Sequence, residues 1–87
     1  MPRYFFHQRT PRGLIEDPDG SDLPDLDAAR DEALAAARDL WASAILGRSD
    51  RSEDSFEIHD GHGRHLLTVP LIDALPEGLR SRRGSAT

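Results

Sequence analysis

The chain has 87 residues, of which 31% are charged, and a formal net charge of −5 at pH 7. This length supports one domain with a small core, and the absence of cysteine excludes disulfides and thiolate metal sites. The acidic excess argues against broad binding to a phosphate backbone. No signal peptide and no run of about 18 apolar residues is found, so we expect a cytoplasmic protein without membrane contact.

An N-terminal hairpin is predicted by an aromatic segment and the turn that follows it. Residues 3–8 (RYFFHQ) are rich in aromatic side chains, which favour strands. Residues 9–13 (RTPRG) supply turn chemistry, and residues 14–16 are expected to return as a short strand. Residues 17–20 (DPDG) then end the hairpin, because Pro18 favours the φ of a turn and Gly20 tolerates positive φ.

A long amphipathic helix follows. Asp25 is expected to cap its N-terminus, because its carboxylate can accept from amide groups of the first turn, and Gly47 is expected to end it. Six apolar residues form one stripe with three larger side chains beside it. The stripe consists of Leu26, Ala29, Ala33, Ala37, Leu40 and Ala44, and its flanks of Leu34, Trp41 and Ile45. The alanines allow close approach to a sheet, and Trp41 is expected to fill wider space near the C-terminal end.

A second hairpin is predicted after a polar connection. Residues 56–59 (FEIH) alternate apolar and polar, residues 60–63 (DGHG) favour a turn, and residues 66–71 return. Pro70 has no N–H to donate, so this strand should end there or lie at a sheet edge. Together the elements predict an α+β domain over residues 1–75, a two-layer ββαββ fold with an antiparallel sheet and one helix packed on one face. Residues 76–87 are expected to form a flexible C-terminal tail.

The second face of the sheet predicts self-association. Phe5 and Phe6 are adjacent, as are Leu66 and Leu67, so apolar side chains should point to both faces. One helix covers one face, and the other is expected to meet another chain, unless the tail or loops cover it. We therefore expect a homo-oligomer, most simply a dimer; the sequence names no other protein partner.

Three histidines form the cluster that could carry chemistry. His59, His62 and His65 recur every third residue around the second turn. A hairpin could bring His59 near His65 across the ladder, but His62 would lie at the tip, and zinc needs three or four converging ligands. We expect solvated turn residues, with no metal and no cofactor. His7, within the aromatic strand, is expected to be structural.

The acidic run of residues 16–27 does not fit a calcium loop. Counted from Asp17, the sixth position is Asp22 instead of glycine, and the twelfth is Ala28 instead of glutamate. Turn and helix-cap chemistry accounts for these carboxylates.

No catalytic residue is assigned from the sequence. There is neither a Gly-x-Ser-x-Gly motif nor a phosphate-binding loop, so we do not expect an enzyme. Arg80, Arg82 and Arg83 make a short basic tail, but it is attached to an acidic body and does not predict a nucleic-acid partner.

Five short motifs occur in the order of a known family. They are residues 2–7 (PRYFFH), 16–20 (EDPDG), 23–25 (LPD), 56–58 (FEI) and 67–70 (LTVP). With them the chain, from Pro2 to Leu75, resembles a family of small bacterial proteins, mainly alphaproteobacterial, that are described as a domain of unknown function. The resemblance implies an intracellular bacterial protein and no particular activity. In that family the second turn is usually acidic and poor in histidine, which argues against a family-wide histidine site.

Three functional hypotheses follow. The leading one is a small non-enzymatic, self-associating interaction or regulatory module. An alternative is a nucleic-acid-associated or antitoxin-like regulator, by analogy of fold alone. A second alternative is a metal binder or enzyme that uses the histidines at a subunit interface.

Overall fold

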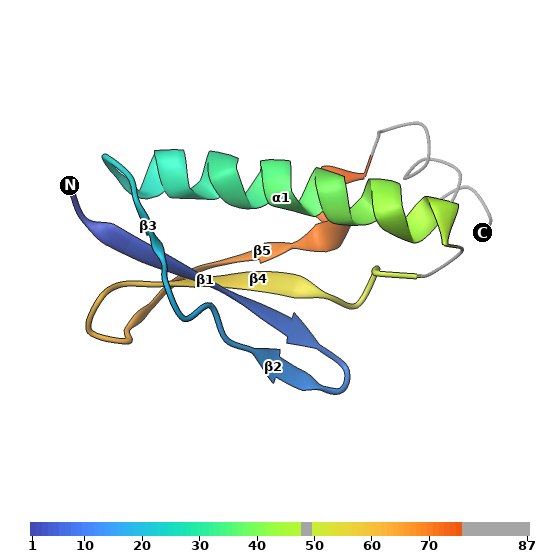
Figure 1. Ribbon diagram of the computed structural model, residues 1–87, viewed down its shortest axis with the longest axis horizontal. Coiled ribbons are helices and arrows are strands. Elements are labelled where there is room, and N and C mark those ends of the chain that lie inside the picture. Colours follow the sequence, from blue (N-terminus) through green and yellow to red (C-terminus); the bar gives the residue numbers. More distant parts are fainter. Residues whose placement is uncertain (48–49, 76–87) are drawn as a thin grey trace.

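The structure, a computed structural model, describes residues 1–47 and 50–75. A helix, α1 (Leu26–Leu46), lies across one face of an antiparallel sheet (Figure 1). The strands are β1 (Arg3–Thr10), β2 (Gly13–Ile15), β3 (Ser21–Asp22), β4 (Ser55–His59) and β5 (His65–Pro70), and a 3-10 turn, η1 (Leu71–Ala74), follows β5. The predicted α+β fold, with one helix on one face of an antiparallel sheet, is confirmed.

The sheet is built around β1. Its strand order is β2-β1-β4-β5, and β3 also pairs with β1, at the N-terminal end of that strand. Gln8 of β1 lies opposite Ile15 of β2, whereas Arg3 lies opposite Asp22 of β3. Residues 16–20 bulge out between these two pairings. The two-residue β3 was not predicted, because so short a segment carries no alternation of apolar and polar residues.

The strand boundaries differ from the sequence prediction by one or two residues. β1 continues to Thr10, whose hydroxyl donates to the Gly13 carbonyl at 3.0 Å and accepts from the Arg12 N–H at 3.1 Å, closing the turn within the hairpin. β5 begins at His65 and ends at Pro70, so Leu71 belongs to η1. The prediction for Pro70 is confirmed, because β5 is an edge strand that ends there.

Both ends of α1 lie where the sequence placed them. Asp25 is the N-cap, and its carboxylate accepts from the Ala28 N–H at 2.8 Å. Gly47 follows the last helical residue, and its N–H donates to the Ser43 carbonyl at 2.9 Å. The φ of Gly47 is −86°, so the helix ends without the left-handed glycine that commonly terminates helices. No helix in the described part of the chain is both long and apolar enough to cross a membrane.

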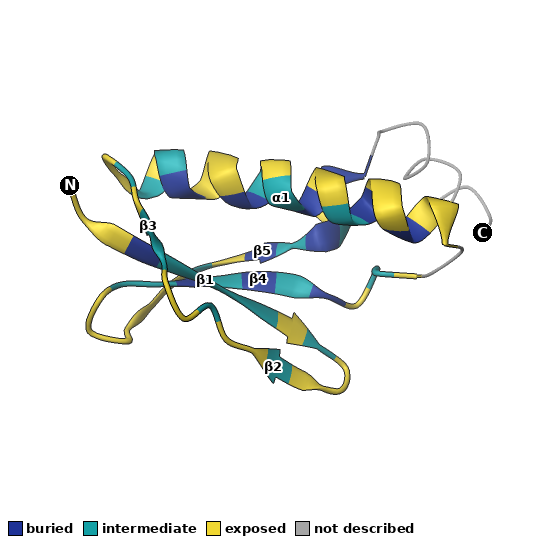
Figure 2. Ribbon diagram, viewed as in Figure 1, coloured by how far each residue is buried: buried dark blue, intermediate teal, exposed yellow. Residues whose placement is uncertain are grey.

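The buried side of α1 follows the predicted stripe, with Trp41 joining it from the flank. Figure 2 shows the buried positions of the helix on the side facing the sheet; they are Ala29, Ala33, Ala37, Trp41 and Ala44. Leu26 and Leu40, which were predicted on the stripe, are half-buried, and Ile45 is 51% exposed. The small alanines let the helix approach the sheet closely. In the last turns of α1, the large indole of Trp41 is the side chain that faces the core.

Trp41 fills the space between α1 and η1, as predicted. It is 5% exposed, and its indole Nε1–H donates to the Leu71 carbonyl at 2.6 Å. Leu71 and Ile58 are the largest fully buried side chains. The core therefore lies between α1, β4 and the β5–η1 junction.

The sheet face opposite α1 is more polar than the sequence analysis predicted. Phe5 and Phe6 do divide between the faces, but Leu67 packs on the core, and Leu66 is an unpaired residue at a bulge, 37% exposed. No described helix covers this face, although the segment of residues 17–20 lies against Phe5 and His7. We call it the open face, and its side chains, assigned by strand alternation and register, include Phe5, His7, Arg9, Glu57, His59, His65 and Thr68.

Candidate functional site

Three imidazoles lie beside one another on the open face. The ring centroids of His7 and His59 are 4.6 Å apart at an interplanar angle of 74°, and those of His59 and His65 are 5.5 Å apart at 87°. Phe5 stacks beside His7 at 6.4 Å. The register explains the cluster, because His59 of β4 lies directly between Phe5 of β1 and His65 of β5. Edge-to-face contacts of this kind hold rings in defined orientations.

Each imidazole is also oriented by a hydrogen bond. The Asp17 N–H donates to Nδ1 of His7 at 3.0 Å, Nδ1 of His59 contacts the Gly63 carbonyl at 3.2 Å, and Nε2 of His65 contacts the Thr68 hydroxyl at 2.7 Å. The first contact assigns the proton of a neutral His7 to Nε2, and the second assigns a proton to Nδ1 of His59. The cluster is therefore pre-organised by the backbone around it.

An ion pair borders the histidines. Nε of Arg9 donates to Glu57 at 2.8 Å, and Nε2 of His59 lies 3.5 Å from the same carboxylate. The Arg9 guanidinium holds the pKa of Glu57 below its ordinary value; partial burial opposes this effect, and His59 adds to it. Because the pair is close to solvent, it contributes at most about 1 kcal/mol to stability. Its main effect is to hold the Arg9 and Glu57 side chains in fixed positions on the open face.

The second hairpin places its histidines as the sequence predicted. His59 faces His65 across the ladder, and His62 is exposed in the turn. His7 has the structural contact expected of it, through Asp17, but it also joins the cluster, which the sequence analysis missed. The pairing of β1 with β4 brings it there, and no local pattern encodes that register. In the described ranges, no group of three or more His, Cys, Asp or Glu side chains is arranged to hold a metal ion.

The contact between His65 and Thr68 was also not anticipated. A hydroxyl beside an imidazole is the first requirement of a nucleophile–base pair, which also needs a third group that orients the base. Both residues are exposed, and no described residue bonds the second ring nitrogen of His65. We interpret the contact as a hydrogen bond that orients the ring.

The acidic residues before α1 have structural partners. Asp17 accepts from three backbone N–H groups, Asp22 pairs with Arg3 at 3.0 Å, and Asp25 caps α1. These contacts agree with the turn and cap chemistry inferred from the sequence. The basic tail at Arg80, Arg82 and Arg83 lies outside the described residues.

We expect the His62→Ala variant to keep its melting temperature, with or without added Zn²⁺. The His62 ring is exposed, and its backbone N–H, which donates to Asp60 at 2.8 Å, is retained in the variant. Thermal unfolding followed by circular dichroism and calorimetric titration with Zn²⁺ check this. Stoichiometric binding below about 1 μM that disappears in the variant would show that the turn is a metal site.

Comparison with protein families places the chain in a family. A family described as a domain of unknown function (DUF6894) matches residues 3–73, which include every strand and α1. No curated protein and no solved structure matches the chain. Because the family match spans most of the chain, the protein belongs to the DUF6894 family.

Proposed function

We propose that the protein is a non-enzymatic interaction module that self-associates through the open face. The observation that carries this proposal is the ring cluster of Phe5, His7, His59 and His65 on the sheet face opposite α1. Rigid rings lose little conformational entropy when a partner packs on them, and aromatic side chains are enriched at interface centres.

The distribution of charge favours a second copy as the partner. On the open face Arg9 and Glu57 neutralise each other at 2.8 Å. The exposed surface of α1, in contrast, carries four acidic and two basic residues: Asp27, Asp31, Glu32, Asp39, Arg30 and Arg38. Two chains that each carry −5 repel least when their neutral faces meet. Two-fold pairing is the commonest closed arrangement, because one patch then satisfies itself.

The interface area that such a dimer requires is modest. A specific interface buries at least about 1,000 Å² in total, or about 500 Å² from each partner. The chain exposes 5825 Å², so a dimer would cover about a tenth of each surface. The open face spans three strands, β1, β4 and β5.

Sedimentation of the wild type and two matched variants tests the proposal. The wild type should sediment at about twice 9.6 kDa near 10–100 μM. Thr68→Arg places a long cation on the open face, opposite Glu57, and should give a monomer with an unchanged circular dichroism spectrum. Ala35→Arg makes a similar change on the exposed surface of α1 and should remain a dimer.

Two outcomes would contradict this proposal. A wild-type monomer that persists to about 1 mM would exclude self-association under ordinary conditions. A dimer that tolerates Thr68→Arg would place the interface elsewhere on the chain.

A nucleic-acid-associated regulator is the second candidate, and the same rings are the observation that favours it. Aromatic side chains on an open sheet face can stack unpaired bases. We rank it second because Arg3, Arg9 and Arg64, the described arginines nearest to the cluster, are each paired with a carboxylate. Fluorescence anisotropy with single-stranded oligouridine at low salt tests it; salt-sensitive binding that His59→Ala abolishes would reverse this ranking.

A further inference from the structure

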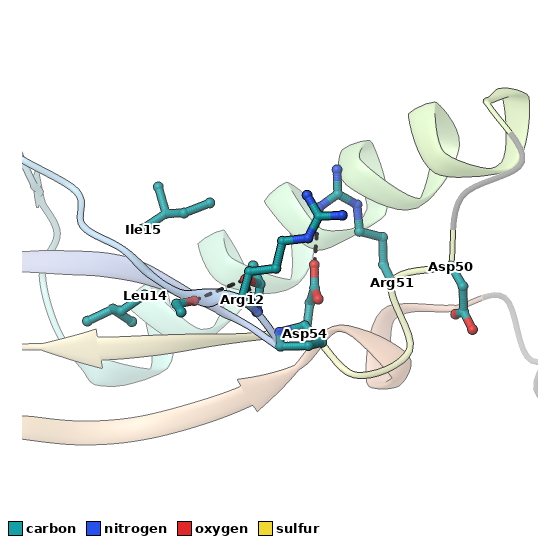
Figure 3. Close-up of a pocket in the computed structure, with 9 residues that line it drawn as sticks. Arg12, Leu14, Ile15, Asp50, Arg51 and Asp54 are labelled. Atoms are coloured by element: carbon teal, nitrogen blue, oxygen red, sulfur yellow. Dashed lines mark hydrogen bonds and ion pairs between the residues drawn. The ribbon is translucent and has the colours of Figure 1, made fainter.

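A cleft of about 590 Å³ opens at the end of β1 away from Phe5. It lies between the turn of the β1–β2 hairpin and the segment that leads into β4 (Figure 3). Two arginines from these separate segments, Arg12 and Arg51, line it, and Figure 3 shows both side chains directed toward the same part of the cleft. The cleft is distinct from the open-face histidines.

The Arg51 side chain is held in place by the buried carboxylate of Asp54. Its Nη1 donates to the Asp54 carboxylate at 3.1 Å, and Gln8 donates to the same oxygen at 3.2 Å. Asp54 is 6% exposed, and its carbonyl accepts from the Leu71 N–H. This arrangement uses one edge of the guanidinium, but its Nε is buried and has no hydrogen-bond partner. Buried donors are almost always paired, so this Nε is a donor that an added acceptor would satisfy.

Arg12 supplies a second cation without a counterion. Its backbone N–H bonds to Thr10, but no described carboxylate pairs with its guanidinium. Asp50 also lines the cleft, yet Figure 3 shows its carboxylate directed away from both guanidinium groups. Of the charged side chains directed into the cleft, Asp54 therefore provides one negative charge against the two positive charges of Arg12 and Arg51. A bound monoanion would balance the remaining charge.

We propose that this cleft binds a small carboxylate ligand with an apolar body. Guanidinium groups present donors in a fork that matches carboxylate oxygens, so one carboxylate can bridge Arg12 and Arg51 and approach the unpaired Nε after a small side-chain movement. Ile15, which is 58% exposed and lies on the same side of the sheet as Gln8, supplies an apolar wall. A phosphate carries more than the single charge required and has no apolar part for that wall, so the geometry favours the carboxylate.

Titration of the ¹⁵N-labelled full chain with hexanoate tests the proposal. Saturable shifts should appear at the backbone amides of residues 12–15 and 51, with a dissociation constant of about 1–10 mM. Hexanol, which keeps the chain and lacks the charge, and inorganic phosphate, which keeps charge and lacks the chain, should each bind at least about tenfold more weakly.

Two variants with the same loss of charge complete the test. Arg12→Ala should weaken hexanoate binding at least about tenfold, whereas Arg30→Ala, on the exposed surface of α1, should leave it unchanged. The proposal is wrong if hexanoate gives no saturable shifts at these amides, if Arg12→Ala binds as the wild type does, or if phosphate binds more tightly than hexanoate.

Discussion

Replacing Trp41 with alanine should lower the free energy of unfolding by about 3–5 kcal/mol, because a buried aromatic leaves a cavity and loses its transfer energy. Trp41 is 5% exposed and lies between α1 and η1. Its loss also leaves the buried Leu71 carbonyl without its 2.6 Å hydrogen bond. Domains are stable by about 5–15 kcal/mol, and one of 87 residues belongs near the lower end. Urea unfolding followed by circular dichroism measures the change.

Two further variants separate the effect of the lost hydrogen bond from the effect of the lost buried volume. Trp41→Phe retains most of the ring and loses the donor, so it should cost about 1–3 kcal/mol from the lost hydrogen bond to Leu71 and the smaller volume. Ile45→Ala removes an apolar side chain one turn later that is 51% exposed, and it should cost less than about 1 kcal/mol. If Trp41→Ala costs no more than Ile45→Ala, the helix faces the sheet through another side.

Local chemistry accounts for the parts of the fold that were predicted correctly. The Asp25 cap and the helix end at Gly47 depend on residues within one helical turn, and Pro70 marks a strand end because it lacks a donor. The orientation of α1 was also predicted closely, since four of its five buried residues lie on the predicted stripe and Trp41 lies on its flank. Which of Leu40 and Trp41 faces inward depends on the space beside η1, a tertiary property that periodicity does not contain.

The candidate sites depend on contacts between distant segments. The facing pair of His59 and His65 was predictable because one hairpin carries both, but His7 joins them only through the register of β1 with β4. Arg12 and Arg51 likewise line one cleft because that register sets the first turn beside the segment leading into β4. Neither pairing has a signal in local sequence, so composition and motifs alone could not find the cluster or the cleft.

Replacing Asp17 with alanine should lower the free energy of unfolding by about 2–4 kcal/mol. The Asp17 carboxylate accepts from the N–H groups of Phe6 at 3.2 Å, Asp19 at 3.1 Å and Gly20 at 3.2 Å. It therefore joins the bulged segment before β3 to β1. Hydrogen bonds to charged groups contribute about 1.5–3 kcal/mol each, and partial exposure reduces their sum.

A neighbouring carboxylate provides the matched control. Asp19→Ala removes the same charge from the same turn but keeps the backbone N–H that donates to Asp17, so its cost should be below about 0.5 kcal/mol. Equal losses for the two variants in urea unfolding would mean that net charge, not the hydrogen bonds of Asp17, determines the stability of the turn.

The pH dependence of stability distinguishes these hydrogen bonds from packing. Burial opposes ionisation of Asp17, but the N–H groups of Gly20, Phe6 and Asp19 outweigh it and hold the pKa of Asp17 below its ordinary value. The folded state then binds fewer protons than the unfolded state, so the stabilisation is complete above the unfolded pKa of about 3.9 and is lost as pH falls through the folded pKa. Asp17→Asn, which keeps the shape and cannot ionise, should be less stable at pH 7 and should lose less stability on acidification than the wild type. Parallel pH profiles for the two proteins would show that the Asp17 carboxylate does not anchor this turn.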